Sequence, residues 1–166
     1  MNAIAYHPTH GMVDPYGGYE DIKNGVIRCV GDPLQRFEED ALRILRACRF
    51  SSQGGFAIED ETFKAMKAMA PLLPGLSAQR LRSELDRFMC GSFVHDALMS
   101  CTDVIAAIIP EIEDLQGFDQ RTKYHIYDVL EHTAYCMQHV APNSLVRWAA
   151  FFHDFGKPYT FTLDKN

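Results

Sequence analysis

The chain contains no long hydrophobic run. Its 166 residues include no stretch of about 18 or more consecutive apolar residues, the length that a membrane-spanning helix requires. The N-terminus, MNAIAYHPTH, lacks the basic, apolar and small-residue order of a secretory signal peptide. The sequence therefore predicts no membrane association, and we expect a cytoplasmic protein.

Paired cysteines and excess positive charge are also missing. The five cysteines are scattered and never spaced as CxxC, so neither a disulfide framework nor a thiolate zinc site is indicated. The formal net charge of −6 excludes a global attraction to nucleic acid. Binding of phosphate groups would depend on local arginine clusters, such as residues 36–49 and 80–87.

Periodicity divides the chain into a short part with strands and a longer helical part. Strands are predicted at residues 2–6, 11–13 and 26–30, but three short strands need a covering layer to make a stable domain. From residue 33 onward the hydrophobic period is helical. The predicted helices are 33–50, 60–70, 77–90, 94–101, 104–109, 124–140 and 143–153. The expected fold class is mainly α, with a small N-terminal β part.

The first predicted helix is amphipathic and unusually charged. At about 100° per residue, its polar arc consists of Arg36, Glu39, Asp40, Arg43 and Arg46. One interpretation is a solvated face, on which each ion pair contributes about 0.2–0.5 kcal/mol. The other is recognition of a nucleobase, because a guanidinium and a carboxylate one turn apart match the pairing edge of cytosine or adenine. Uracil and guanine lack an amino group at that position.

Five segments follow one another in an order that is typical of a known family. They are DPYGGYEDIKNGVIR, GDPLQRFEEDALRILRACRF, SAQRLRSEL, YDVLEHT and HDFGKP. Together they resemble the bacterial tRNA nucleotidyltransferase and poly(A) polymerase family, the CCA-adding enzymes. The resemblance runs over nearly the whole chain. It implies CTP and ATP as substrates, tRNA as the partner, and Mg²⁺ as the cofactor of the parent enzyme.

The resemblance also implies roles for the charged helix. The EDxxR element of the family corresponds to Glu39, Asp40 and Arg43. In that family this element recognises the incoming CTP or ATP, so Asp40 and Arg43 would select the base and Glu39 would orient the arginine. We count Arg46 with the nucleotide-binding residues.

Two further elements of the family have counterparts outside the charged helix. A flexible hinge element corresponds to Asp21, Gly25 and Arg28. The RxxxE element corresponds to Arg80 and Glu84, which would brace the nucleotide-binding helix. The alternative for Arg80 and Glu84 is an ordinary surface ion pair.

The catalytic parts of that family have no counterpart in this sequence. The family transfers nucleotides with a Gly-Ser loop and two metal-binding aspartates, and we assign no catalytic residue here. We expect residues 1–31 to be the remnant of a nucleotidyltransferase head, 32–116 to form a neck and body, and 117–166 to begin an HD-type domain. On this hypothesis Met1 is an internal methionine of a longer protein, and this chain alone adds no nucleotides.

A helix rich in histidine precedes a His-Asp dipeptide. Histidines 125, 132 and 139 recur every seven residues, and the next helix leads to His153 and Asp154. His132, His153 and Asp154 could bind one divalent ion, since imidazole and carboxylate together suit Mn²⁺, Fe²⁺, Zn²⁺ or Ni²⁺. Such an ion could activate a water molecule against a phosphate ester.

The HD dipeptide carries little weight by itself, because His95 and Asp96 form a second one at a predicted helix start. The EHT and HDFGKP segments add weight, because they resemble the HD phosphohydrolase superfamily. The distal aspartate of that superfamily has no counterpart in this sequence.

Three functions therefore compete. The favoured one is a nucleotide-selecting and RNA-supporting part of a CCA-adding or poly(A)-adding enzyme. The alternatives are an HD-type metal-dependent phosphohydrolase, acting as phosphatase or phosphodiesterase, and a noncatalytic RNA-binding helical module. The sequence leaves the oligomeric state open, and it does not distinguish addition of CCA from addition of A, CC or poly(A).

Overall fold

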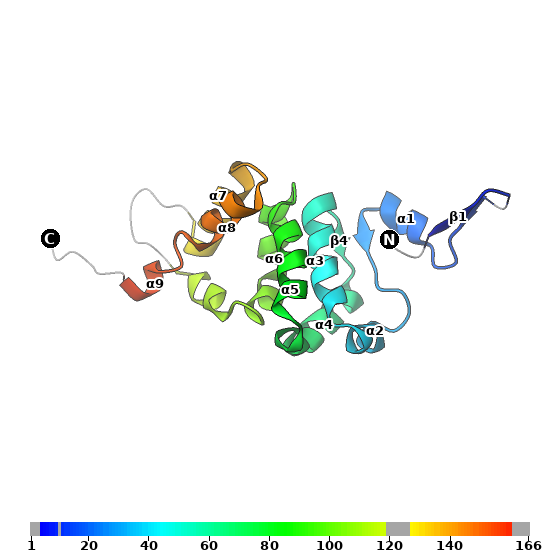
Figure 1. The fold of residues 1–166 in the computed structure, drawn as a ribbon, viewed down its shortest axis with the longest axis horizontal. Helices are drawn as coiled ribbons and strands as arrows, with labels where there is room; N and C mark the ends of the chain where they lie inside the picture. Colours follow the sequence, from blue (N-terminus) through cyan, green and yellow to red (C-terminus); the bar gives the residue numbers. More distant parts are fainter. Residues whose placement is uncertain (1–3, 10, 119–126, 161–166) are drawn as a thin grey trace.

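The computed structural model describes residues 4–9, 11–118 and 127–160, and it confirms a mainly α-helical fold (Figure 1). The helices are α1 (Gly18–Lys23), α2 (Pro33–Glu39), α3 (Leu42–Gly54), α4 (Asp60–Met69), α5 (Ala78–Met89), α6 (Val94–Ala106), α7 (Val129–His139), α8 (Ser144–Phe152) and α9 (Lys157–Thr160). Two 3-10 helices, η1 (Ala70–Gly75) and η2 (Pro110–Leu115), follow α4 and α6. None of the helices within the described residues combines the length and apolar character of a membrane span.

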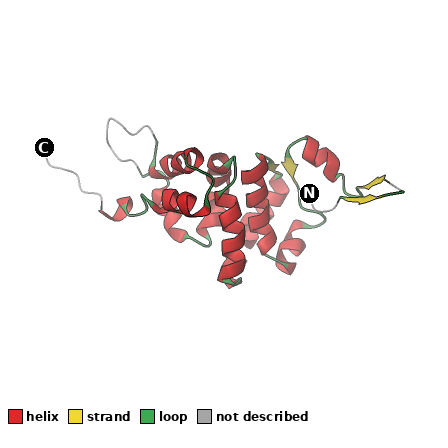
Figure 2. Cartoon of the chain, turned by 45° about the horizontal axis from the view of Figure 1, so that its top comes forward, coloured by secondary structure: helices red, strands yellow, loops and turns green. Residues whose placement is uncertain are grey.

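The strands lie toward one end of the molecule (Figure 2). The strand predicted at residues 11–13 is confirmed, whereas the one predicted at 26–30 covers only Val26 and Ile27. The strands β1 (Ala5–His7) and β2 (Gly11–Val13) form an antiparallel pair. The strand β3 (Val26–Ile27) pairs in parallel with β4 (Ala57–Ile58), which the sequence did not predict. A two-residue strand is too short to show an alternating pattern, so β4 is recognised only from its pairing with β3 in the fold.

The predicted helix at residues 33–50 is wrong as a single element. It is divided into α2 and α3 by Asp40, whose backbone is extended at φ −156° and ψ 98°. The Asp40 carboxylate accepts a hydrogen bond from the backbone N–H of Leu42 at 3.2 Å. A short acidic side chain that bonds a nearby backbone N–H competes with the helix and starts a new one.

Other helix boundaries also differ from the prediction. The two helices predicted at 94–101 and 104–109 form the single helix α6. Helix α7 begins at Val129, where the Asp128 side chain accepts from the backbone N–H of Glu131 at 2.8 Å. The predicted helical residues 124–126, including His125, lie outside the described residues.

One hydrophobic core extends from α2 to α8. Its most deeply buried side chains include Ile44, Leu45, Met66, Leu73, Phe88, Met89, Leu98, Ile105, Ile112, Leu115, Leu130 and Phe151. The α7 and α8 side chains thus contribute to the same core as α3, α5 and α6. The predicted division into segments 1–31, 32–116 and 117–166 stays a prediction.

Polar side chains join α5 to α8 at the edge of this core. One carboxylate oxygen of Asp86 accepts hydrogen bonds from Ser144 Oγ at 2.8 Å and from Trp148 Nε1 at 2.6 Å. The bond from Trp148 is the largest of the effects that lower the pKa of Asp86 from its ordinary value of 3.8. The ionised carboxylate therefore stabilises the contact between α5 and α8.

This contact predicts a loss of stability in acid. Because the pKa of Asp86 is lower in the folded protein, the contribution is complete above pH 3.8 and is lost as the pH falls through the folded value. We expect Asp86→Asn to lower the free energy of unfolding at neutral pH by roughly 1–2 kcal/mol. Its stability should also depend less on pH below that value. Urea unfolding followed by the fluorescence of Trp148, the single tryptophan, measures both effects.

The exposed Glu38 provides the control for this experiment. Glu38→Gln removes a carboxylate on the exposed face of α2, so the acid profile of this variant should match that of the unmodified protein. Equal profiles for Asp86→Asn and the unmodified protein would contradict the stabilising role of Asp86.

A second prediction concerns the close contact between α3 and the end of α5. Ser52 is fully buried, and its Oγ donates to the carbonyl oxygen of Phe88 at 2.6 Å. A Cβ atom added at Gly91 would collide with Ser52 Oγ and with its backbone carbonyl. We expect Gly91→Ala to destabilise the protein by about 1–3 kcal/mol, as overpacking does. Gly75→Ala is the control, since no atom lies within 4 Å of the added group; equal thermal stability of the two variants would contradict the prediction.

Candidate functional site

A cavity of about 500 Å³ lies beside β3, α2 and α3. This volume is within the range of small-ligand sites. Its lining residues are Tyr16, Ile27, Arg28, Cys29, Val30, Arg36, Phe37, Asp40, Arg43, Arg46, Ala47, Phe50 and Thr62. Four arginines and a single carboxylate line the wall, although the whole chain is acidic. The cavity therefore offers guanidinium donors to an anionic group, and Asp40 as an acceptor to a polar, planar group.

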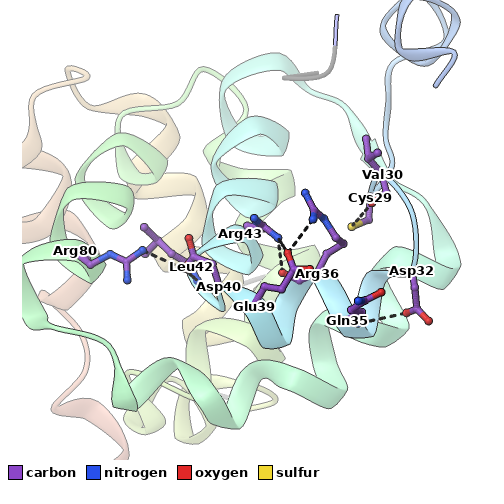
Figure 3. Close-up of polar contacts among 10 residues, drawn as sticks. All are labelled: Cys29, Val30, Asp32, Gln35, Arg36, Glu39, Asp40, Leu42, Arg43 and Arg80. Atoms are coloured by element: carbon purple, nitrogen blue, oxygen red, sulfur yellow. Dashed lines mark hydrogen bonds and ion pairs between the residues drawn. The ribbon is translucent and has the colours of Figure 1, made fainter. Parts of the chain in front are cut away.

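Glu39 holds the guanidinium of Arg43 (Figure 3). The Nη1 atom of Arg43 donates to Glu39 Oε2 and to the carbonyl oxygen of Arg36, both at 2.8 Å. Arg36 Nη1 donates to the same Glu39 oxygen at 2.8 Å. The hydrogen bond from Arg43 is the main cause of the lowered pKa of Glu39. Both bonds of Arg43 use Nη1, so they do not engage its Nε and Nη2 atoms.

Arg80 of α5 holds the carboxylate of Asp40 (Figure 3). The Arg80 Nη2 atom donates to Asp40 Oδ1 at 3.0 Å, and the backbone N–H of Leu42 donates to the same oxygen at 3.2 Å. These bonds do not engage Oδ2. Asp40 lies at the break between α2 and α3, where its carboxylate is within reach of Arg80 on α5.

The alternative of an ordinary surface ion pair requires Glu84 to contact Arg80, and it does not. It accepts a hydrogen bond from Arg49 Nε at 2.7 Å, and both side chains are almost buried, with 9% and 12% exposed. The Arg49 guanidinium also lies 4.1 Å from the centre of the Phe50 ring. Both residues therefore connect α5 to the segment that carries the cavity residues. Arg80 contacts Asp40, just before α3, and Glu84 contacts Arg49 within α3. Their role in nucleotide binding stays a prediction.

Of the predicted hinge residues Asp21, Gly25 and Arg28, only Arg28 lines the cavity. Gly25 follows α1 with a positive φ of 66°, a conformation that glycine adopts without steric cost. Arg28 Nε lies 3.3 Å from Asp21 Oδ2, and its Nη1 lies 3.5 Å from Glu59 Oε1. Arg28 thus joins the end of α1 to the start of α4.

The sequence reasoning missed Glu59 and Thr62. The Thr62 hydroxyl accepts from the backbone N–H of Cys29 at 3.0 Å and donates to Glu59 Oε2 at 2.8 Å. The same Glu59 oxygen caps α4 by accepting from the Thr62 N–H at 2.8 Å. An acidic N-cap followed three residues later by threonine is a local signal of a helix start, but its contact with the cavity wall depends on tertiary packing.

The structure brings the three predicted metal ligands together. The Nε2 atoms of His132 and His153 lie 3.4 Å apart, and Asp154 Oδ2 lies 3.5 Å and 3.1 Å from them. Cys136, which was not predicted, joins this cluster with its Sγ 3.5 Å from His132 Nε2. Its spacing of four residues from His132 is a signal that could have identified it. Lys157 Nζ lies 2.6 Å from Asp154 Oδ2.

The remaining histidines of the predicted pattern lie elsewhere. His139 Nδ1 lies 2.9 Å from the carbonyl oxygen of Tyr135 on its own helix. His95 lies in the first turn of α6, with its Nδ1 2.7 Å from Asp96 Oδ1. The second HD dipeptide therefore starts a helix, as expected.

Known proteins similar to this chain share both its sequence and its fold. Residues 55–115 match the family described as "Probable RNA and SrmB-binding site of polymerase A". A CCA-adding enzyme of Leuconostoc mesenteroides is 39% identical in an alignment of 135 residues that covers 76% of this chain and 34% of that enzyme. The CCA-adding enzyme of Geobacillus thermodenitrificans is 46% identical over 98 residues, 59% of this chain and 24% of the enzyme. The crystal structure of the Bacillus stearothermophilus CCA-adding enzyme in complex with CTP superposes with a TM-score of 0.63 at 36% identity, covering 69% of this chain and 30% of that one.

These similarities confirm the resemblance inferred from the sequence. Over the matched residues, this chain is similar to a helical region of the bacterial CCA-adding enzymes. It spans about a third or less of the length of the curated relatives it matches.

The two ion pairs that join α5 to Asp40 and to Arg49 predict unequal effects on stability. Glu84→Ala would leave the nearly buried Arg49 without its carboxylate, so we expect a loss of roughly 3 kcal/mol in the free energy of unfolding. Arg80→Ala removes a pair whose side chains are 48% and 33% exposed, and we expect a loss below about 1 kcal/mol. Urea unfolding monitored by circular dichroism measures both. Equal losses would contradict this division between a stabilising pair and an orienting pair.

Proposed function

We propose that this chain is the part of a tRNA nucleotidyltransferase that selects the incoming CTP or ATP. One observation carries the proposal: Asp40 and Arg43 line the same cavity, and each is held by another side chain. Glu39 bonds Arg43 through Nη1, and Arg80 bonds Asp40 through Oδ1. The Oδ2 atom of Asp40 and the Nε and Nη2 atoms of Arg43 are thus the groups to face a base.

The chemistry of the two groups accounts for the choice of base. The carboxylate accepts a hydrogen bond from the exocyclic amino group of cytosine or adenine, while the guanidinium donates to the adjacent ring nitrogen. Uracil and guanine carry a carbonyl oxygen in place of that amino group, so its lone pairs would face the carboxylate. The remaining cavity arginines, Arg28, Arg36 and Arg46, bind phosphate groups in this proposal.

Other parts of the proposal concern the parent enzyme. The curated relatives are named CCA-adding enzymes, and the region that includes α4, α5 and α6 matches a probable RNA-binding site. We therefore propose that tRNA binds the region of α4, α5 and α6. Mg²⁺ is the cofactor that accompanies the nucleoside triphosphate in this proposal. The cytoplasmic location stays a prediction.

A binding experiment with the chain tests the proposal. We expect CTP and ATP to bind about tenfold or more tightly than UTP and GTP, since one good pairing contact discriminates by that amount. Asp40→Ala should abolish the preference, and Arg43→Ala should weaken binding of both preferred nucleotides. Isothermal titration calorimetry measures these affinities.

Arg82→Ala removes an arginine of α5 whose side chain is 80% exposed and which does not line the cavity, so nucleotide binding should not change. Equal affinity for all four nucleotides would leave a noncatalytic RNA-binding module as the better explanation. In that case, tRNA affinity should fall steeply with salt.

A second candidate function rests on the histidine cluster. The distances of 3.1–3.5 Å between His132, His153 and Asp154 support our proposal that they bind a divalent ion of Mn, Fe, Ni or Zn. With an open position, such an ion would supply an activated water for hydrolysis of a phosphate ester. This activity would not depend on Asp40 or Arg43.

A further inference from the structure

We propose that Cys136 is a fourth ligand of this cluster, and that His132, Cys136, His153 and Asp154 form a closed Zn²⁺ site that ties α7 to the end of α8. The inference rests on the metal site proposed above, but it gives that site a structural role in place of the hydrolytic one. It is independent of nucleotide selection, because none of the four residues lines the cavity that contains Asp40.

Four separations between the proposed ligand atoms, 3.1–3.5 Å, come close to those of a tetrahedral zinc site. With Zn–N bonds of about 2.0–2.1 Å and a Zn–S bond of about 2.3 Å, neighbouring ligand atoms lie about 3.3–3.6 Å apart. The two histidine Nε2 atoms are separated by 3.4 Å, and Cys136 Sγ lies 3.5 Å from His132 Nε2. The sulfur and both nitrogens all lie within 4.8 Å of one another. Asp154 Oδ2 lies beside this group of three, at 3.1 Å from His153 Nε2 and 3.5 Å from His132 Nε2, and is the fourth ligand in this proposal.

The backbone and an outer hydrogen bond orient these ligands. His132 and Cys136 are four residues apart on α7, so they share one face of the helix. His153 ends α8, and Asp154 follows it directly. The Nδ1–H of His153 donates to the carbonyl oxygen of Ala150 at 2.7 Å. Because a carbonyl only accepts, the Nε2 atom of neutral His153 carries a lone pair toward the cluster, as in metal-binding histidines.

The donor set indicates zinc and a structural role. One thiolate with two imidazoles favours Zn²⁺ over Mg²⁺ or Mn²⁺, which prefer oxygen ligands. Four protein ligands fill a tetrahedral site and leave no position for an activated water, whereas catalytic zinc sites have three. The site would therefore hold two helices together and would not hydrolyse phosphate esters.

Lys157 is the competitor for this ion. Its ammonium group lies 2.6 Å from Asp154 Oδ2, the oxygen nearest both histidines, so metal binding must displace or share this contact. Removing the lysine charge should therefore strengthen metal binding. The exposed fractions of the two side chains are 33% and 12%, so we expect tightening of up to about fivefold in Lys157→Met.

Titration with Co²⁺ tests the site directly. The chain is purified without a histidine tag, treated with a chelator and titrated with Co²⁺ and then Zn²⁺. We expect one Co²⁺ per chain with the intense visible absorption of tetrahedral cobalt and a thiolate-to-cobalt charge-transfer band, both removed by Zn²⁺. Zn²⁺ should also raise the midpoint of thermal unfolding.

Variants separate the possible outcomes. Cys136→Ser should lose the charge-transfer band and the thermal effect of Zn²⁺, while Cys90→Ser at the end of α5 should keep both. Circular dichroism of the metal-free variants shows whether they fold. A six-coordinate cobalt spectrum that is lost in His132→Ala but unchanged in Cys136→Ser would overturn the role of Cys136 and favour the open, three-ligand site. Absence of stoichiometric metal would overturn both metal proposals, and neither result would affect the nucleotide titrations.

Discussion

The interruption of the helix at Asp40 is the constraint on which the candidate nucleotide site depends. The Asp40 carboxylate accepts a hydrogen bond from the N–H of Leu42. This bond lies between the end of α2 and the start of α3. The break lets α2 turn to pack against α4, with Phe37 buried, while α3 packs against α5 and α6. The same carboxylate oxygen also accepts from Arg80. One short side chain thus determines the direction of two helices and presents a polar group to the cavity.

The cavity residues are oriented by neighbours that lie mostly outside it. Glu39 bonds Arg43, Arg80 bonds Asp40, and Glu59 with Asp21 bonds Arg28. These pairs are partly exposed, so each contributes little to stability. Their value is orientation, because a binding group that is already held loses less entropy when a ligand arrives. Stability comes from the apolar core and from nearly buried pairs such as Arg49 with Glu84.

The histidine cluster lies toward the other end of the helical part, where α7 and α8 pack together (Figure 1). The core that buries Leu130 and Phe151 continues into α3 and α5, so the two ends are parts of one packed body within the described residues. The contact of Asp86 with Trp148 adds a polar link between α5 and α8. A metal ion at the cluster would stabilise the packing of α7 against α8. It would not change ligand binding in the arginine-lined cavity.

The sequence by itself determined the mainly helical class, most helix positions, and Asp40, Arg43, His132, His153 and Asp154 as candidate site residues. Helical period, capping residues and short motifs act over a few positions, so they can be read directly from the chain. Only the tertiary structure decided which residues meet across the core. The contact of Arg80 with Asp40, the pairing of β3 with β4, and the approach of Cys136 to His153 join distant segments. The absence of a CxxC spacing therefore does not exclude a single thiolate ligand. Helix packing places Cys136 beside the two histidines, and local periodicity does not encode that packing.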